Sequence, residues 1–477
     1  MTDDEYFDDD EFRELLYEYE QAVRSGQPVF MDADDLGDVA DYYQQHGRYD
    51  EAQAALERAA ELQPDSVVAL NFKMHNAINE GDYDAAEAYL EQIADHDLPE
   101  YVYGRAELWM AQGEEERADN YLRDNFSGVS PEEYQDYVLD VVNLYSDYGY
   151  NEKAMEWMMR ARPDDSDDFK ELMAHTLFGL GKYDDSERIF KELIDRDPFQ
   201  KRYWSALANT QFMKEEYGES VSSSEYAIAI DPSDAEGLLA KANGLFRLDN
   251  FDEALTYYQR YGEQEPDDEF GLLHQGTCLI SLNRCEEAAA VLQTALKVAP
   301  VDSPYLVEIL QELAFAYSDM EMPETALHYL DRTDELDCDH VDMLVIKGHI
   351  LLANGRTEQA EDMFRQAIIK SDNSPRTMMR VIVSLYDNQY VEASYQAFLK
   401  YFKMVPADWN EGYAYMALVC HSLKRYDEFL DYLREACRRN AHEAQLVLGH
   451  LFPDGVTPAG YYDFMEKQFK NNNNQPS

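Results

Sequence analysis

Apolar residues recur along the chain with the period of an amphipathic helix, and short turns interrupt the pattern at regular intervals. The stretch GRYDEAQAAL at 47–56 returns as GDYDAAEAYL at 81–90 and as GKYDDSERIF at 181–190. Each copy has a glycine, an aromatic residue and a small residue at fixed distances from one another. The pattern predicts pairs of short helices that are joined by tight turns and repeated along the chain.

The small residue of this pattern is an anchor on which the whole chain can be aligned. The alignment gives twelve anchors that are 32 to 38 residues apart, most often 34: Ala52, Ala86, Ala118, Ala154, Ser186, Ser220, Ala254, Ala288, Ala326, Ala360, Ala393 and Phe429. A period in this range is typical of stacked helical hairpins, each of which buries its apolar side against its neighbours. We therefore expect about twelve repeats over residues 33–440.

The other recurring positions suit such a hairpin. A proline twelve residues after the anchor is expected to end the second helix. An aromatic residue three positions before the anchor is expected to pack between the two helices. Asn283 and Asn388 are expected to replace the left-handed glycine that ends the first helix in six repeats. Those glycines stand five residues before their anchors: Gly47, Gly81, Gly113, Gly149, Gly181 and Gly355.

The two ends of the chain have patterns of their own. Residues 11–25 predict a capping helix whose buried side carries Phe12, Leu15, Leu16, Tyr19, Ala22 and Val23. The predicted division is an acidic segment and capping helix at 1–32, the repeat array at 33–440, capping helices at 441–470 and a disordered tail at 471–477.

The repeating pattern resembles the tetratricopeptide repeat (TPR) family. The repeat at 201–234 resembles it best, with Trp204, Leu207, Ala208, Tyr217, Ala227 and Pro232 at the family's packing positions. Two repeats depart from the pattern: the repeat at 99–132 has Glu115 in place of the aromatic residue, and the repeat at 307–340 has Met322-Pro323 where the turn is expected. The resemblance implies an all-α fold, a right-handed superhelical α-solenoid of about twelve TPR-like helix–turn–helix repeats with capping helices.

Charge narrows the classes of partner. The net charge is −57, from 97 acidic and 40 basic side chains, and residues 1–399 carry almost all of it. A field of this sign repels phosphate backbones and anionic lipids, so we expect neither nucleic acid nor a membrane surface as a partner. Two interpretations of the acidity stay open: it provides only solubility, or it attracts a basic segment of a partner protein.

Neither catalytic nor metal-binding chemistry is predicted. The five cysteines are scattered without a Cys-x-x-Cys pair, and the eleven histidines never gather at ligand spacing. HEAQL at 442–446 lacks the second histidine of a zinc-protease helix. Repeats and caps occupy nearly the whole chain, so we expect no enzyme and no cofactor. The chain also lacks an apolar stretch of membrane-spanning length and a leader pattern, which favours a cytoplasmic protein.

The candidate binding surface comes from the resemblance. In TPR arrays the first helix of each repeat lines the concave face, and the residue eleven before the anchor lies there. Amide and imidazole groups beside aromatic rings suit an extended peptide. We predict a peptide-binding patch formed by Asn143, His175, Phe178, Asn209, Phe212, Asn243 and Phe246.

The predicted function is a non-enzymatic scaffold that binds a protein or an extended peptide in this concave face. The alternative is a regulatory or substrate-recruiting subunit of a separate enzyme. The pattern specifies a surface, and it predicts neither the partner's identity nor the oligomeric state.

Overall fold

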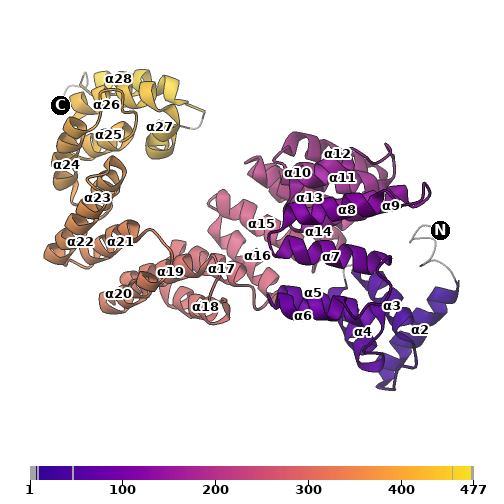
Figure 1. The fold of residues 1–477 in the computed structure, drawn as a ribbon. Helices are drawn as coiled ribbons and strands as arrows, with labels where there is room; N and C mark the ends of the chain where they lie inside the picture. The colour runs from indigo at the N-terminus through magenta and orange to yellow at the C-terminus, as the bar shows by residue number, and fades with distance from the viewer. Residues whose placement is uncertain (1–6, 8–9, 46–47, 454, 474–477) are drawn as a thin grey trace. The chain divides into compact units, whose positions relative to one another are not determined.

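The computed structural model describes residues 7, 10–45, 48–453 and 455–473 (Figure 1). Every regular element in these ranges is a helix. The all-α prediction is therefore confirmed. Gly47, one of the six predicted turn glycines, lies outside the described residues.

The chain forms two compact units, Met1–Glu215 and Glu216–Ser477. The first unit contains a capping helix, five helical hairpins and one further first helix. In chain order these are α2 (Asp10–Ser25), α3 (Ala33–Gln45), α4 (Tyr49–Leu62), α5 (Val67–Asn79), α6 (Tyr83–Leu90), α7 (Pro99–Ala111), α8 (Glu115–Phe126), α9 (Tyr134–Asp147), α10 (Asn151–Met158), α11 (Asp167–Gly179), α12 (Tyr183–Arg196) and α13 (Lys201–Met213).

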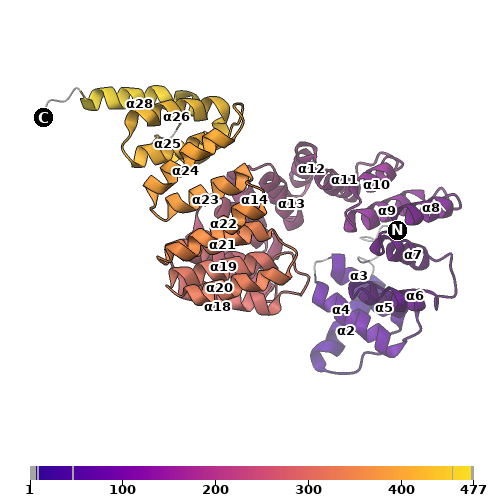
Figure 2. The same ribbon diagram turned by 60° about the vertical axis from the view of Figure 1, so that its left-hand side comes forward.

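The second unit begins with α14 (Tyr217–Ile230) and continues with six hairpins and two closing helices. The hairpins are α15 (Ala235–Arg247) with α16 (Phe251–Gln264), α17 (Glu269–Ser281) with α18 (Cys285–Val298), α19 (Leu306–Asp319) with α20 (Pro323–Asp331), α21 (His340–Ala353) with α22 (Thr357–Lys370), α23 (Pro375–Asp387) with α24 (Val391–Met404), and α25 (Tyr413–Ser422) with α26 (Tyr426–Arg439). A short 3-10 helix, η1 (Arg332–Glu335), follows α20. Figure 2 shows α18, α20, α19, α21 and α22 stacked one above another, and each of α18 to α21 also contacts the helix that follows it in the chain.

Each hairpin turn among the described residues closes with one residue in the left-handed conformation, five residues before the anchor. Glycine has this role at positions 81, 113, 149, 181 and 355, with φ between 70° and 76°. Six other turns use a larger residue with φ between 56° and 69°: Glu215, Asp249, Asn283, Glu321, Gln389 and Lys424. The prediction for Asn283 is confirmed, and the prediction for Asn388 is wrong because its neighbour Gln389 takes the left-handed conformation.

The anchors are buried where the two helices of a hairpin cross. Eleven of the twelve predicted anchors are at most 1% exposed. The exception is Ala393, which faces solvent, while Ser394 is fully buried. Helix α24 begins at Val391, and the anchor is the fourth residue of every second helix. The predicted alignment is therefore one residue early in this hairpin, and a shift of one residue turns a helical side chain by about 100°.

The other recurring positions also have the predicted roles. The Tyr183 ring lies 5.5 Å from that of Phe178, and the Phe251 ring lies 5.5 Å from that of Phe246, so these aromatic residues join the second helix to the first. In five second helices, proline is the residue directly after the C-cap, at positions 64, 198, 232, 266 and 300. A proline there cannot continue the helix.

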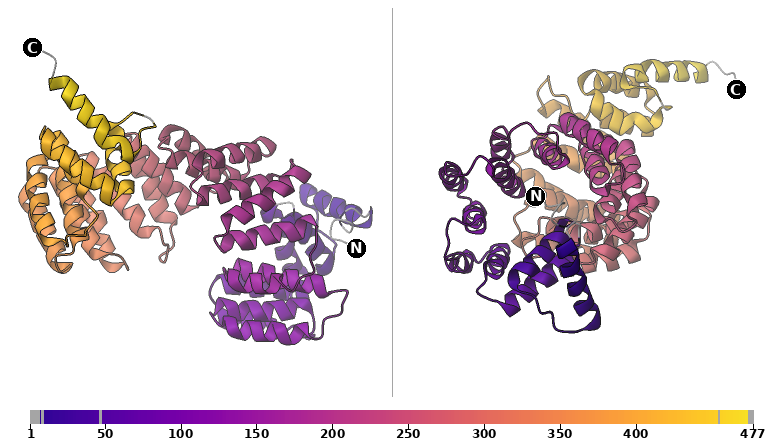
Figure 3. Two further views of the ribbon diagram at one scale, coloured as in Figure 1. Left: turned by 90° about the horizontal axis from the view of Figure 1, so that it is seen from above. Right: turned by 90° about the vertical axis from the view of Figure 1, so that its right-hand side faces the viewer.

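The capping helices differ from the prediction in detail. Phe12 and Tyr19 of α2 are 3% and 5% exposed, as expected, but Val23 is 57% exposed and does not belong to the buried side. Two helices close the chain, α27 (Ala441–Leu448) and α28 (Pro458–Asn473), and α28, yellow in Figure 3, packs on α26 and α27. Three residues of the predicted disordered tail, 471–473, are helical, and 474–477 lie outside the described residues.

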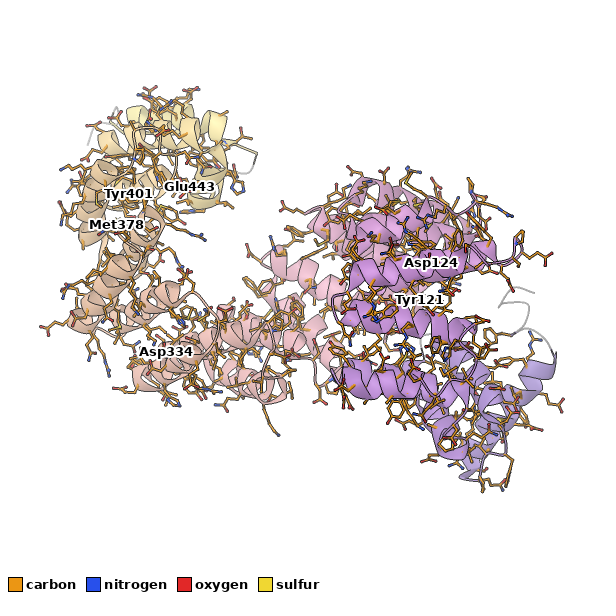
Figure 4. The ribbon with its side chains drawn as sticks, viewed as in Figure 1. Tyr121, Asp124, Asp334, Met378, Tyr401 and Glu443 are labelled. Atoms are coloured by element: carbon orange, nitrogen blue, oxygen red, sulfur yellow. The ribbon has the colours of Figure 1, made fainter. Side chains whose placement is uncertain are left out.

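Glu443 ties the closing helices to the last hairpin (Figure 4). Its carboxylate Oε1 accepts a hydrogen bond of 2.8 Å from the backbone N–H of Gly412, the residue before α25. Gly412 has a φ of 88°, which only glycine adopts without strain. A negative charge at this end of α25 suits the helix dipole.

Candidate functional site

The residues eleven positions before the anchors lie on one side of the first helices, and we call this surface the first-helix face. At least one pair of consecutive members of the row is in contact within each unit. In the first unit, Nδ1 of His75 lies 3.1 Å from the Glu107 carboxylate. In the second unit, the rings of Phe315 and His349 are 6.2 Å apart. In each unit, these two side chains of the row therefore lie side by side on neighbouring first helices.

The first unit contains five of the seven predicted site residues. Asn143 lies on α9, His175 and Phe178 on α11, and Asn209 and Phe212 on α13. The two asparagines and His175 are exposed, and the two phenylalanines are half-buried. Helices α9 and α11 pack on each other, and α11 is joined to α13 by an ion pair of 3.1 Å between Glu171 and Arg202. Three successive first helices therefore present amide, imidazole and phenyl groups on one face.

The other two predicted residues, Asn243 and Phe246, belong to the second unit. The Asn243 side-chain oxygen accepts a hydrogen bond of 2.6 Å from the Tyr258 hydroxyl. The Phe246 ring packs against Phe251, Tyr258 and His274 at centroid distances of 5.4–6.5 Å. Both side chains are half-buried and have structural partners. Five of the seven predicted residues therefore lie in the first unit and two in the second.

Local packing fixes the rings of this patch. The His175 ring makes an edge contact with Phe190 at 5.2 Å. His175 is solvent-accessible on one side and surrounded by protein atoms on the other. This partial desolvation, with a smaller contribution from Arg202, lowers the pKa of His175 below its ordinary value. The imidazole is therefore neutral near pH 7, and it can donate one hydrogen bond and accept another.

Carboxylates surround the patch on the first-helix face. Glu107 accepts a hydrogen bond of 3.1 Å from the Tyr148 hydroxyl, and Asp140 accepts one of 3.0 Å from Tyr103. Burial raises the pKa of Asp147, and the neighbouring Glu107 raises it further. The pKa of Glu171 is also raised, because burial outweighs the effect of Arg202. Negative charge is therefore dense along this face.

Sequence analysis missed a set of cations on the opposite side of the first helices. Arg105, Lys241 and Lys347 each stand thirteen residues before an anchor and are 7–8% exposed. Each of these cations pairs with carboxylates on the second helix of the preceding hairpin or just after that helix. Lys241 lies 2.8 Å from Glu225, and Arg105 lies 2.6 Å from Glu87. A basic residue at this position of the repeat is the sequence signal, and it predicts an ion pair between neighbouring hairpins.

The third of these ion pairs borders a cavity of about 660 Å³ in the second unit. Lys347 pairs there with Asp331 at 2.8 Å and with Asp334 of η1, labelled in Figure 4, at 3.4 Å. The cavity lies between α20 and α22, over Leu344 and Leu351 of α21. Helix α20 has 9 residues, whereas α22 has 14, and the shorter helix leaves this space open.

The described part of the chain has no metal-binding cluster, no disulfide and no membrane-spanning helix. No three His, Cys, Asp or Glu side chains in it gather in a way that could hold a metal ion. All five cysteines are free. Among the described helices, none combines the length and the apolar character that a membrane span requires.

Stacked hairpins with a small anchor, a left-handed turn and a row of accessible side chains define a helical repeat protein. Models of the tetratricopeptide repeat match residues 43–108, 172–235, 239–303 and 341–368. Over these residues the chain is built of tetratricopeptide repeats. The curated proteins include none that matches it.

Several solved structures are similar in fold. A tetratricopeptide repeat protein from Parabacteroides merdae is 15% identical, with a TM-score of 0.43 over 55% of this chain and 98% of that one. PilW, a type IV pilus biogenesis factor, is 18% identical, with a TM-score of 0.39 over 44% of this chain and 96% of that one. YrrB, a TPR protein with an unusual peptide-binding site, is 20% identical, with a TM-score of 0.35 over 42% and 97%.

Proposed function

We propose that the protein is a non-enzymatic scaffold that binds a partner protein, through an extended peptide segment, along the first-helix face of its first unit. The observation that carries this proposal is the set of accessible polar groups on three successive first helices. Asn143 and Asn209 are exposed, and neither amide side chain has a hydrogen-bond partner within the described residues. Such groups are free to bond the backbone of a peptide.

The spacing of the helices suits an extended ligand. Packed helices lie about 8–10 Å apart, and an extended peptide advances about 3.3 Å per residue, so each first helix meets about every third peptide residue. Asn143 and Asn209 would bond the peptide backbone, and Phe178 and Phe212 would contact its apolar side chains. Affinity would arise from many modest contacts along the face.

We further propose that the bound segment is basic. The carboxylates of Glu107, Asp140, Asp147 and Glu171 line or border the patch, and Arg202 is paired with one of them. Charge complementarity of this kind accelerates association and weakens as salt rises. Affinity that is equal at low and high salt would reduce the acidity to a role in solubility. The free cysteines favour a reducing compartment, and we place the binding in the cytoplasm.

Selection of peptides on the intact chain tests this function. Random twelve-residue peptides displayed on phage are selected on the full-length protein, and the selected peptides are synthesised with a fluorescent label. We expect Asn143→Ala and Asn209→Ala each to weaken their binding about tenfold, the effect of losing one or two hydrogen bonds. Asn120→Ala is the matched control, because Asn120 is an exposed asparagine on the second helix α8. Equal affinity of all four proteins would reject the proposed face.

A further inference from the structure

The first-helix face of the second unit is more apolar than that of the first unit. Helices α17, α19, α21 and α23 contribute half-buried apolar side chains to it, among them Ile280, Phe315, Ile346 and Val383. Phe315 of α19 contacts His349 of α21. Apolar side chains on neighbouring helices form a strip that an extended peptide can cover.

One carboxylate in this strip has no partner. Asp342 is paired with Arg380, and His349 lies 3.2 Å from the Asn388 side chain. Glu312 of α19 is half-buried, yet within the residues that the structure describes its carboxylate makes no hydrogen bond and no ion pair. Phe315 follows it by three residues and therefore lies beside it on the same side of the helix.

Among the described residues no cation compensates the charge of Glu312, and Glu308 is the one charged group that acts on its carboxyl. Glu308, one turn earlier on α19, is negative, and it lies near His274 of α17. On α21 the titratable groups of this face are Asp342, already paired, and His349. Helix α20 and η1 lie against Leu306 and Leu310, on the other side of α19. Burial, reinforced by Glu308, raises the pKa of Glu312 to about 7.

An unpaired and partly desolvated carboxylate destabilises the folded chain, and a strongly shifted ionisable group of this kind is characteristic of functional sites. We propose that Glu312 binds the lysine or arginine side chain of an extended peptide that lies along the first-helix face of the second unit, with Phe315 and Ile346 contacting its apolar residues. This inference rests on the proposed function, since it assumes that the chain binds peptides, and it adds a second subsite of defined chemistry.

The binding has a pH signature. The carboxylate binds a cation only when it is ionised, and a pKa of about 7 implies that about one tenth of Glu312 is ionised at pH 6 and about nine tenths at pH 8. We therefore expect the affinity for a lysine-containing peptide to increase about tenfold between pH 6 and pH 8. In Glu312→Gln the neutral amide removes this dependence.

Two matched peptide libraries test the subsite. Fluorescent ten-residue peptides are random at nine positions and have either lysine or Nε-acetyl-lysine at the tenth, so that the two libraries differ in one charge. Binding to the full-length protein is measured for the wild type, for Glu312→Gln, and for the control Glu361→Gln, which changes an exposed glutamate of the second helix α22. We expect the wild type and the control to prefer lysine about tenfold, and Glu312→Gln to show no preference.

Each outcome decides the matter. Equal discrimination by Glu312→Gln and the wild type, or no discrimination by the wild type, overturns the subsite. If discrimination by Glu312→Gln persists while Asn143→Ala and Asn209→Ala weaken peptide binding, only this inference fails and the proposed function stands. If no peptide of either library binds, and Asn143→Ala and Asn209→Ala have no effect on peptide binding, both the subsite and the proposed function are rejected.

Discussion

The unpaired carboxylate of Glu312 has a consequence for stability that is independent of any ligand. Its pKa of about 7 lies above the ordinary value of 4.5, so the folded chain binds this proton more tightly than the unfolded chain does. The stability that the group contributes is therefore present at low pH and is lost as pH rises from about 4.5 through about 7. Glu312→Gln removes the titrating group and is expected to be the more stable protein above pH 7.

The magnitude follows from the two pKa values. A separation of about 2.5 between them corresponds to about 3 kcal/mol at alkaline pH, and partial solvent exposure of the side chain reduces the expected difference to about 2 kcal/mol. At pH 5 the carboxyl is almost entirely protonated in the folded state, and the two proteins are expected to differ by less than about 1 kcal/mol.

Amide hydrogen exchange is the appropriate assay, because repeat arrays open locally and a single melting temperature averages over hairpins. The free energy of opening is measured for α19 and α21 at pH 5 and pH 8, with Glu361→Gln as the control. The reasoning is supported if these helices exchange more slowly in Glu312→Gln than in the wild type at pH 8 and not at pH 5. Equal protection of the two proteins at pH 8, or lower protection in the variant, would refute it.

Three further predictions concern the repeats, and amide hydrogen exchange of the hairpin that carries the substitution measures each. Ser394→Asp buries an unpaired charge and should cost about 3 kcal/mol or more, whereas Ala393→Asp should cost less than about 0.5 kcal/mol; equal costs would contradict the corrected register. Asp249→Gly relieves a positive φ and should stabilise by about 1 kcal/mol; a loss of stability would count against this explanation. Changing Asp331 and Asp334 together to asparagine should lower the free energy of unfolding by about 2 kcal/mol, because the buried ammonium of Lys347 loses its partners. An unchanged free energy of unfolding would show that water already solvates this ammonium.

Local signals were sufficient to predict the hairpins. A small anchor such as Ala254, with an aromatic residue three positions earlier and a turn residue five earlier, depends on contacts within one hairpin and is therefore visible in a single sequence. The same signals gave the wrong anchor at Ala393. Asn388 and Tyr390 have the spacing of a turn residue and an aromatic residue, but they lie one position before the true turn. The register of that hairpin was decided by burial of Ser394, which the local pattern does not contain.

The candidate site was less predictable, because it depends on which helices are neighbours in space. The row containing Asn143, His175 and Asn209 followed from the repeat period. The hydrogen-bond partner of Asn243 did not follow from the repeat period, because the Tyr258 hydroxyl belongs to the other helix of the hairpin. Glu312 was missed for a similar reason: one glutamate among many acidic residues becomes distinctive only when the charges around it are known to be paired elsewhere.

Photocrosslinking tests the central claim, that the first-helix face of the first unit binds the peptide, most directly. The photoreactive amino acid p-benzoylphenylalanine replaces either Phe178, on that face, or Phe199, which is 78% exposed in the loop after α12. Each full-length protein is irradiated with a labelled peptide selected from the phage library. The account predicts a crosslink from position 178 and none from position 199. Crosslinking from position 199 with none from position 178 would contradict it.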